Sequence, residues 1–173
     1  GQKMTEVWAT ACVELFTEDV DIYNSIWDFY EYIVSLEDNA TLYIHNLKFD
    51  GCFIVNWLLS NDYEWCTSGR EKTFHGIISK MGQWYMLDIC YGYKGKRKLH
   101  TKIYDSLKKL PFSVKQIGKA FNLNVLKVDH GEEFYTRERS KEHIITEEEK
   151  LYINNDIEVV ADALSIQFSQ GLV

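Results

Sequence analysis

The sequence predicts one compact α/β domain. Runs rich in β-branched and aromatic residues, typical of strands, are interspersed with segments whose apolar residues recur every three or four positions, as in helices. The 173 residues, 46% of them hydrophobic, suffice for one sizeable core and leave little room for a second. We therefore expect residues 1–173 to form a single domain.

The first third of the chain is expected to contain two strands, each followed by a helix. Residues 6–15 predict a strand covered on both faces, and residues 25–36 predict a helix that ends at residues 38–39. A short buried strand is expected at residues 41–44. An apolar stripe then predicts a second helix over residues 51–59.

Four β-like runs follow and are expected to pair as an antiparallel meander. They span residues 63–66, 73–79, 84–91 and 100–104. A glycine-containing basic stretch, residues 94–102, connects the last two runs. The favoured interpretation of its lysines is a solvated turn that protects a sheet edge, and a phosphate contact is the alternative.

The last third is expected to be mainly helical. Pro111 interrupts the chain before a short helix near residues 114–121, and a polar, charged loop is expected over residues 127–142. Residues 146–149, Thr-Glu-Glu-Glu, form a capping box and place carboxylates at the positive end of a helix dipole. Helical periodicity then continues to Phe168.

Composition excludes several classes of protein. The formal net charge of −7 argues against holding nucleic acid by overall electrostatics, so any DNA binding must be local. No apolar run reaches the roughly 18 residues of a spanning helix, and no signal peptide is evident, so we expect a cytoplasmic protein without a membrane partner. The cysteines are far apart, which favours buried free thiols over disulfides or a metal site: Cys12, Cys52, Cys66 and Cys90.

A polar and aromatic cluster follows the strand at residues 41–44, where open α/β sheets collect ligand groups. Asp50 is a hard oxygen ligand suited to magnesium or manganese, and Asn46 is a donor to a sugar or phosphate. Phe49 and Phe53 form a wedge on which unpaired bases can stack. Each has an ordinary alternative, as a helix cap, a turn residue or part of the core, and judged one at a time these alternatives are favoured.

Further candidates lie in the second half of the chain. Tyr152 and Asp156 are one helical turn apart, so a phenol that orients water and a metal-binding carboxylate share one face. Ser106, before Leu107, can hold a phosphate through its hydroxyl or amide, although a turn-forming serine is the ordinary explanation. Lys127 offers a point charge to a phosphate oxygen, or is a surface lysine.

Taken in order, these segments resemble the exonuclease domain of protein-primed family B DNA polymerases of bacteriophages. Residues 45–51 resemble its second exonuclease motif, residues 152–156 its third, and residues 104–111 its (Ser/Thr)-Leu-x-x-hydrophobic DNA-binding motif. Residues 81–86 and 92–98 resemble the region between them, so the resemblance covers essentially the whole chain. It implies a ribonuclease H-like α/β fold, with a mixed central sheet flanked by helices and a β-meander.

The resemblance also implies a 3′–5′ proofreading exonuclease that acts on single-stranded 3′ ends of DNA with two Mg²⁺ or Mn²⁺ ions. Asp50 and Asp156 become metal-site carboxylates, Tyr152 the water-orienting phenol and Lys127 the catalytic lysine at the phosphate. The implied grip on the unpaired primer end consists of His45, Asn46, Phe49, Phe53, Ser106 and Leu107. One departure is His130, which stands where the lysine motif of the family has a hydrophobic residue.

A larger departure concerns the first motif of the family, Asp-x-Glu on the opening strand. It is expected just before Gly1, because residues 5–15 already resemble the second strand of the fold. With part of the metal-site carboxylates missing, we expect the 173-residue chain itself to be a weak or inactive nuclease. The implied partners are the polymerase domain of the parent chain and a terminal protein. Two alternatives stay open: a non-catalytic module that binds single-stranded DNA or protein, and a standalone nuclease of the same fold.

Overall fold

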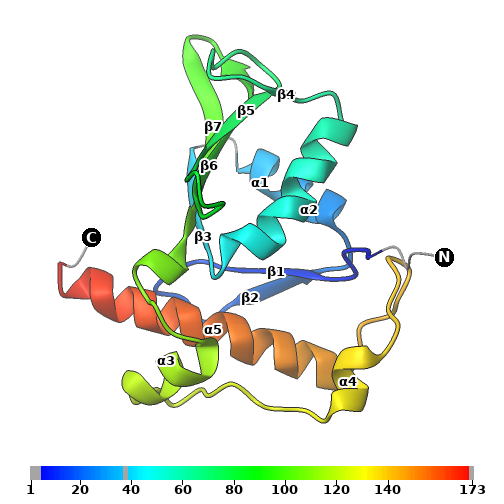
Figure 1. Ribbon diagram of the computed structural model, residues 1–173, viewed down its shortest axis with the longest axis vertical. Helices are drawn as coiled ribbons and strands as arrows, with labels where there is room; N and C mark the ends of the chain where they lie inside the picture. The colour runs from blue at the N-terminus through cyan, green and yellow to red at the C-terminus, as the bar shows by residue number, and fades with distance from the viewer. Residues whose placement is uncertain (1–4, 37–38, 172–173) are drawn as a thin grey trace. The chain divides into compact units, whose positions relative to one another are not determined.

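The computed structural model describes residues 5–36 and 39–171 (Figure 1). The chain divides into two compact units, one of residues 30–111 and the other of residues 1–29 with 112–173. The expectation that residues 1–173 form a single domain stays a prediction.

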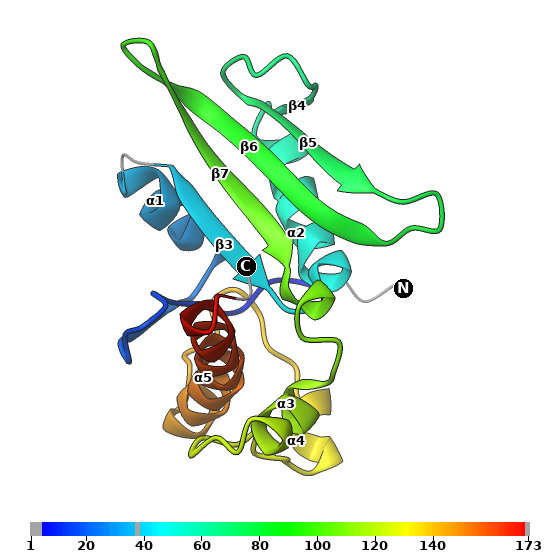
Figure 2. The same cartoon turned by 90° about the vertical axis from the view of Figure 1, so that its left-hand side faces the viewer.

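The unit of residues 30–111 contains a five-stranded mixed sheet with the strand order β3-β7-β6-β5-β4 (Figure 2). Its strands are β3 (Ala40–Ile44), β4 (Glu64–Trp65), β5 (Thr73–Ile78), β6 (Trp84–Lys94) and β7 (Arg97–Asp105). Strands β5, β6 and β7 pair antiparallel, which confirms that part of the expected meander. Strand β4 was expected to be antiparallel but runs parallel to β5, because residues 66–72 form no tight hairpin turn and carry the chain back to the same end of the sheet.

One face of this sheet is covered by α2 (Leu47–Ser60), as Figure 2 shows. Leu47 and Leu58 of the helix, and Leu87 and Ile103 of the sheet, have no exposed surface. Burial of each such side chain contributes roughly 1.5–3 kcal/mol. The helix begins at Leu47, four residues before the expected start at residue 51. Asn46 adopts the left-handed conformation, with a φ of 64°, and this turns the chain from β3 directly into the helix.

The basic stretch forms the turn of the β6–β7 hairpin. Lys94 pairs with Arg97, and Gly95 has a φ of 63° in the two-residue connection between them. A left-handed residue at this place matches the right-handed twist of the two strands. The turn itself is exposed, as expected, whereas residues 97–102 of the basic stretch lie in β7, where Lys98 Nζ is 4.0 Å from Asp88 Oδ2.

The four cysteines are free, as expected, but they are not all buried. Cys90 in β6 is 2% exposed, whereas Cys52 lies on the outer face of α2 and its thiol donates a hydrogen bond to the carbonyl of Lys48. The thiol is accommodated on the surface because the helix backbone supplies an acceptor one turn earlier. Burial of Cys52 was a wrong prediction.

Helix α1 (Ile26–Ser35) confirms the helix expected from the apolar periodicity. The Ser25 hydroxyl accepts a hydrogen bond of 3.1 Å from the amide of Asp28, so Ser25 satisfies one of the free donors at the helix start. Residue 38, at the expected end of the helix, lies outside the described residues.

The second unit is organised around the long helix α5 (Glu147–Ser169), which contacts α3 (Val114–Ala120) and the antiparallel hairpin of β1 (Thr10–Val13) and β2 (Val20–Tyr23) (Figure 1). Both helices were expected, and the predicted capping box of Thr146 and Glu149 is present at the start of α5. Helix α3 also begins with a capping box, formed by Ser113 and Gln116, which was not predicted. The strand expected at residues 6–15 is shorter and only half-buried, and β2 was not predicted. Helix α4 (Glu132–Thr136) occupies part of the expected loop.

The core of this unit lies where α3 crosses α5. Val159 and Ala163 of α5 have no exposed surface. A side chain at Gly118 of α3 would come within 2.9 Å of Leu126 and 3.7 Å of Val159, so glycine allows this close approach. Within the described ranges, no helix is both long and apolar enough to cross a membrane.

Candidate functional site

In the unit of residues 30–111, one buried carboxylate joins the β3–α2 junction to the end of β7. Asp105 is 6% exposed, and its Oδ1 accepts hydrogen bonds from the amides of Asn46 at 3.0 Å and Leu107 at 2.9 Å. These backbones are adjacent because β3 and β7 run parallel, with Ile44 opposite Asp105. The sequence analysis did not single out Asp105, although an Asp before Ser-Leu is a typical cap signal.

The same contact zone holds His45 beside Ser106. The Nδ1 atom of His45 lies 3.1 Å from the hydroxyl oxygen of Ser106, which has no exposed surface. The hydroxyl therefore supports the imidazole, and the amide of Leu107 supports Asp105. The expected grip of Ser106 and Leu107 on the primer end stays a prediction, and the structure adds that both residues also bond within the protein.

Helix α2 carries Phe49, Asp50 and Phe53 on its first two turns. Phe49 is 65% exposed and meets the half-buried ring of Phe53 edge-on, with the ring centroids 5.9 Å apart. The alternative in which Phe49 belongs to the core is therefore wrong, as is the cap alternative for Asp50, which lies inside the first turn. Although the Asp50 residue is exposed overall, desolvation of its carboxyl raises its pKa above the ordinary value.

In the other unit, the structure brings Lys127, Tyr152 and Asp156 together. The Lys127 Nζ lies 3.1 Å from Asp156 Oδ2 and 5.5 Å from the centre of the Tyr152 ring. Partial burial lowers the pKa of Lys127, but the hydrogen bond and charge of Asp156 outweigh burial and the pKa is raised. Burial, and then the charge of Asp156, raise the pKa of the Tyr152 phenol.

An aromatic group encloses Tyr152. The rings of Phe134, His130 and Tyr135 lie 5.1, 5.6 and 6.0 Å from its centre. His130 stacks on Phe134 at 4.0 Å with an interplanar angle of 17°, so the imidazole fills the space expected for a hydrophobic side chain. Sequence reasoning missed Phe134 and Tyr135, and the only signal was an aromatic pair within a charged segment.

The carboxylate of Asp156 has one oxygen that could bind a divalent cation. Asp156 Oδ1 is buried and has no hydrogen-bond partner within the described part of the chain, while Oδ2 faces Lys127. A buried carboxylate oxygen without a partner is costly, and a cation relieves that cost. No group of three or more His, Cys, Asp or Glu side chains in residues 5–36 and 39–171 is arranged to hold a metal. The expected approach of Asp50 to Asp156 joins the two units and stays a prediction.

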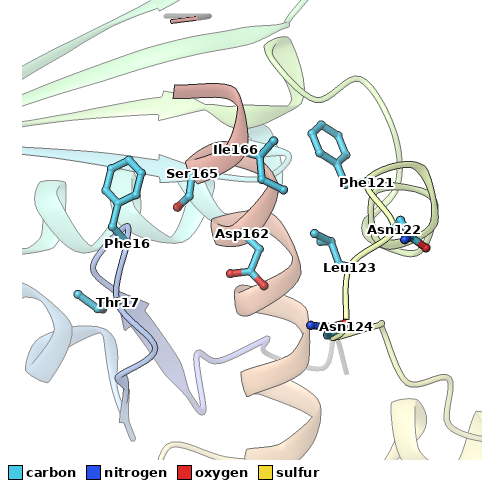
Figure 3. Close-up of a pocket in the computed structure, with 9 residues that line it drawn as sticks. All are labelled: Phe16, Thr17, Phe121, Asn122, Leu123, Asn124, Asp162, Ser165 and Ile166. Carbon is cyan, nitrogen blue, oxygen red and sulfur yellow. The ribbon is translucent and has the colours of Figure 1, made fainter. Parts of the chain in front are cut away.

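A separate hollow of about 350 Å³ lies beside the second half of α5 (Figure 3). Burial, and then the charge of Glu18, raise the pKa of Asp162, which lines it. The lining contains none of the residues expected to carry chemistry: Phe16, Thr17, Phe121, Asn122, Leu123, Asn124, Asp162, Ser165 and Ile166. The hollow is therefore distinct from the cluster around Tyr152.

The mixed sheet with its flanking helices and antiparallel strands defines a ribonuclease H-like fold of the kind found in polymerase exonuclease domains. The chain superimposes on phi29 DNA polymerase complexed with single-stranded DNA with a TM-score of 0.90 at 51% identity, over 97% of this chain and 29% of that one. The match to phi29 DNA polymerase complexed with primer-template DNA has a TM-score of 0.88. The expected fold class is confirmed.

Sequence comparison identifies the family. Residues 33–172 match the family described as DNA polymerase type B, organellar and viral. The chain is 56% identical over 167 residues to the DNA polymerase of Bacillus phage M2 and 53% identical over 169 residues to that of Bacillus phage phi29. These matches cover 96% of this chain and 28% of each relative. The chain thus belongs to the phage-type, protein-primed family B DNA polymerases and spans 28% of the length of these relatives.

Proposed function

We propose that this chain is the 3′–5′ proofreading exonuclease domain of a DNA polymerase and removes nucleotides from single-stranded 3′ ends. The observation that carries the proposal is the cluster of Lys127, Tyr152 and Asp156, with one buried carboxylate oxygen unpartnered in the described structure. Support also comes from the relatives, which are DNA polymerases, and from a similar structure that is complexed with single-stranded DNA.

The cluster has the groups that phosphodiester hydrolysis requires. Lys127 keeps its positive charge despite partial burial, because Asp156 raises its pKa, so it can neutralise a phosphate oxygen. The phenol of Tyr152 also stays protonated, and its hydroxyl can orient the attacking water. Asp156, together with Asp50 in the proposal, would hold magnesium or manganese. A bound divalent ion supplies the Lewis acidity that activates water and stabilises the leaving 3′ oxygen.

The β3–α2 junction supplies the proposed grip on single-stranded DNA. The 65% exposed ring of Phe49 offers a face for a base, and Asp105 fixes the backbone beside His45 and Asn46. Contacts of this kind do not depend on the overall charge, which is −7. The polymerase domain of the parent chain and a terminal protein are the further partners we propose.

A second candidate function is a non-catalytic module that binds single-stranded DNA. The observation that favours it is that, in the part of the chain the structure describes, no three acidic, His or Cys side chains are arranged for a metal. Such a module needs the aromatic grip and no cation.

Release of nucleotides from a 3′-labelled single-stranded oligonucleotide, with Mg²⁺ or Mn²⁺, distinguishes the two functions. The exonuclease proposal predicts that Asp156→Asn lowers the rate at least about 100-fold, the scale of loss for a group that stabilises the transition state. Asp162→Asn, one and a half turns further along α5, is the matched control and should leave the rate within about twofold. Equal rates for both variants, or binding without cleavage, would favour the non-catalytic module.

A further inference from the structure

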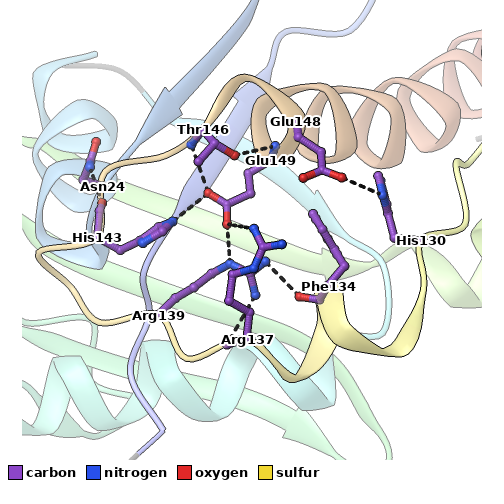
Figure 4. A network of polar contacts seen from close by, with 9 residues as sticks. All are labelled: Asn24, His130, Phe134, Arg137, Arg139, His143, Thr146, Glu148 and Glu149. Carbon is purple, nitrogen blue, oxygen red and sulfur yellow. Dashed lines mark hydrogen bonds and ion pairs between the residues drawn. The ribbon is translucent and has the colours of Figure 1, made fainter.

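The first turn of α5 contains a carboxylate with no exposed surface, that of Glu149 (Figure 4). Its Oε1 accepts a hydrogen bond of 2.5 Å from Arg139 Nε, and its Oε2 accepts one of 2.7 Å from His143 Nε2. Oε2 also accepts from the amide of Thr146 at 3.0 Å, the second half of the capping box. A capping box requires only the bond from the Thr146 amide to this carboxylate. The bonds from Arg139 and His143 therefore indicate a further structural role for Glu149.

The charge of Glu149 is fixed by its partners. Burial acts to raise the pKa of this carboxyl, but the hydrogen bonds from Thr146, Arg139 and His143 outweigh burial and hold the pKa at about 2. The carboxylate is therefore ionised at every pH at which the protein works. A buried, ionised and fully bonded carboxylate has one low-energy arrangement, so it fixes the orientation of Arg139.

Arg139 connects this carboxylate to α4. Its guanidinium is 6% exposed, and Nη2 donates a hydrogen bond of 2.9 Å to the carbonyl of Phe134. The same guanidinium lies 4.9 Å from the centre of the Phe134 ring and 4.8 Å from that of Trp8. Arg139 thus holds Phe134 at both its backbone and its ring, which a lysine could not do because it lacks the planar fork.

Phe134 in turn packs against the phenol that the proposed chemistry uses. Its ring is 6% exposed and lies 5.1 Å from that of Tyr152. Helix α4 has five residues, too few to be stable by its own hydrogen bonds, so its position depends on such contacts. Glu149 and Tyr152 are three residues apart on α5. The contacts from Glu149 to Arg139, from Arg139 to Phe134 and from Phe134 to Tyr152 therefore connect two adjacent turns of this helix.

We propose that Glu149 and Arg139 are positioning residues for Tyr152, a proposal that rests on the proposed exonuclease function. The carboxylate orients the guanidinium, the guanidinium holds Phe134, and the Phe134 ring fixes the Tyr152 phenol beside Asp156. Neither Glu149 nor Arg139 touches the phosphate or the metal in this account. Their effect on cleavage passes entirely through the Tyr152 hydroxyl.

The test uses two variants of this chain and a matched control. Glu149→Gln removes the charge that orients Arg139, and Arg139→Lys keeps the charge but loses the fork. Glu147→Gln makes the same chemical change as the first variant in the same turn, on a side chain that is 90% exposed. Ring-to-ring contacts of Tyr152 are read by NMR on chains with ¹³C-labelled tyrosine and phenylalanine, and cleavage is measured on a 3′-labelled oligonucleotide.

The proposal predicts a strong Tyr152–Phe134 ring contact in the unsubstituted chain and in Glu147→Gln, and its loss in the other two variants. Arg139→Lys should lower kcat about 10- to 100-fold with KM within about twofold, since a misplacement near 1 Å has this effect. In a Tyr152→Phe background the same substitution should change kcat less than about twofold, because the hydroxyl to be positioned is gone. A merely structural role would lower the rate equally in both backgrounds.

Two outcomes overturn the positioning proposal: ring contacts retained in both Glu149→Gln and Arg139→Lys, or an equal loss of rate with and without the Tyr152 hydroxyl. Failure of the proposed function has a different signature. If Asp156→Asn and Tyr152→Phe leave nucleotide release unchanged while the ring contacts are lost in Glu149→Gln and Arg139→Lys, the exonuclease proposal fails and the structural link between Arg139 and Tyr152 stands.

Discussion

The two groups of candidate residues are held in place in different ways. At the β3–α2 junction, backbone amides converge on one carboxylate, so the geometry follows from the parallel pairing of β3 and β7. Around Tyr152, side chains of α4, α5 and the intervening loop hold one another through rings and charges. The stability of the β3–α2 junction should therefore depend mainly on its hydrogen-bond acceptor. The stability of the cluster around Tyr152 should depend on pH and on the shape of its side chains.

The largest expected effect breaks the first arrangement. Asp105→Ala leaves the part-buried amides of Asn46 and Leu107 without an acceptor and removes a carboxylate that is 6% exposed, and an unsatisfied donor costs about 1–3 kcal/mol when buried. We expect the free energy of unfolding to fall by about 4 kcal/mol in urea denaturation. Asp105→Asn keeps an acceptor oxygen and should lose much less. Equal losses in the two variants would show that the charge, and not the acceptor, holds the junction.

The next largest effect is a pH dependence of stability, which is expected for the contacts around Tyr152 and not for the β3–α2 junction. Glu149 has a folded-state pKa of about 2, below its ordinary value of 4.5, so its contribution to stability is complete above pH 4.5 and is lost as the pH falls towards 2. The loss is on the order of 3 kcal/mol. Unfolding curves from pH 6 to pH 2 should show this loss in the parent chain and in Glu147→Gln, but not in Glu149→Gln. The same pH dependence in Glu149→Gln would assign it to other carboxylates.

A smaller effect concerns binding at the junction. Phe49→Ala should weaken the affinity for single-stranded DNA by about 1–3 kcal/mol, the range for loss of one stacked base. Because Phe49 is 65% exposed, the thermal unfolding temperature should hardly change. Phe16, which is 69% exposed in the other unit, provides the control, and Phe16→Ala should leave the affinity unaltered. Fluorescence anisotropy with a labelled oligonucleotide measures both, and equal affinities would remove Phe49 from the grip.

The smallest effect is expected at the basic hairpin, which neither arrangement uses. Gly95 has a φ of 63° and open space around its missing side chain, so Gly95→Ala costs only backbone strain, about 1 kcal/mol. DNA affinity should not change if the lysines of this turn are merely solvated. A parallel loss of affinity in Gly95→Ala would favour the alternative in which the turn contacts phosphate.

Features that depend on residues close together in the sequence could be predicted, whereas features that depend on long-range contacts could not. The start of α5 was predictable because Thr146 and Glu149 bond to each other within one turn. Strand β2 and helix α4 escaped prediction because each is only four or five residues long and packs against α5, which lies further along the chain. Asp105 was missed for the same reason, since Asn46 is 59 positions away. The motif residues were found through the family resemblance, not through their individual patterns.

We propose that Asp50 and Asp156 jointly bind the divalent metal used for cleavage. Addition of Mn²⁺ to the isotope-labelled chain tests it directly, because the paramagnetic ion broadens the NMR signals of nearby residues. Joint binding predicts concurrent broadening of the Asp50 and Asp156 amide signals, and its loss at both positions in Asp156→Asn but not in Asp162→Asn. Broadening at only one of the two, or at neither, would contradict a shared metal site.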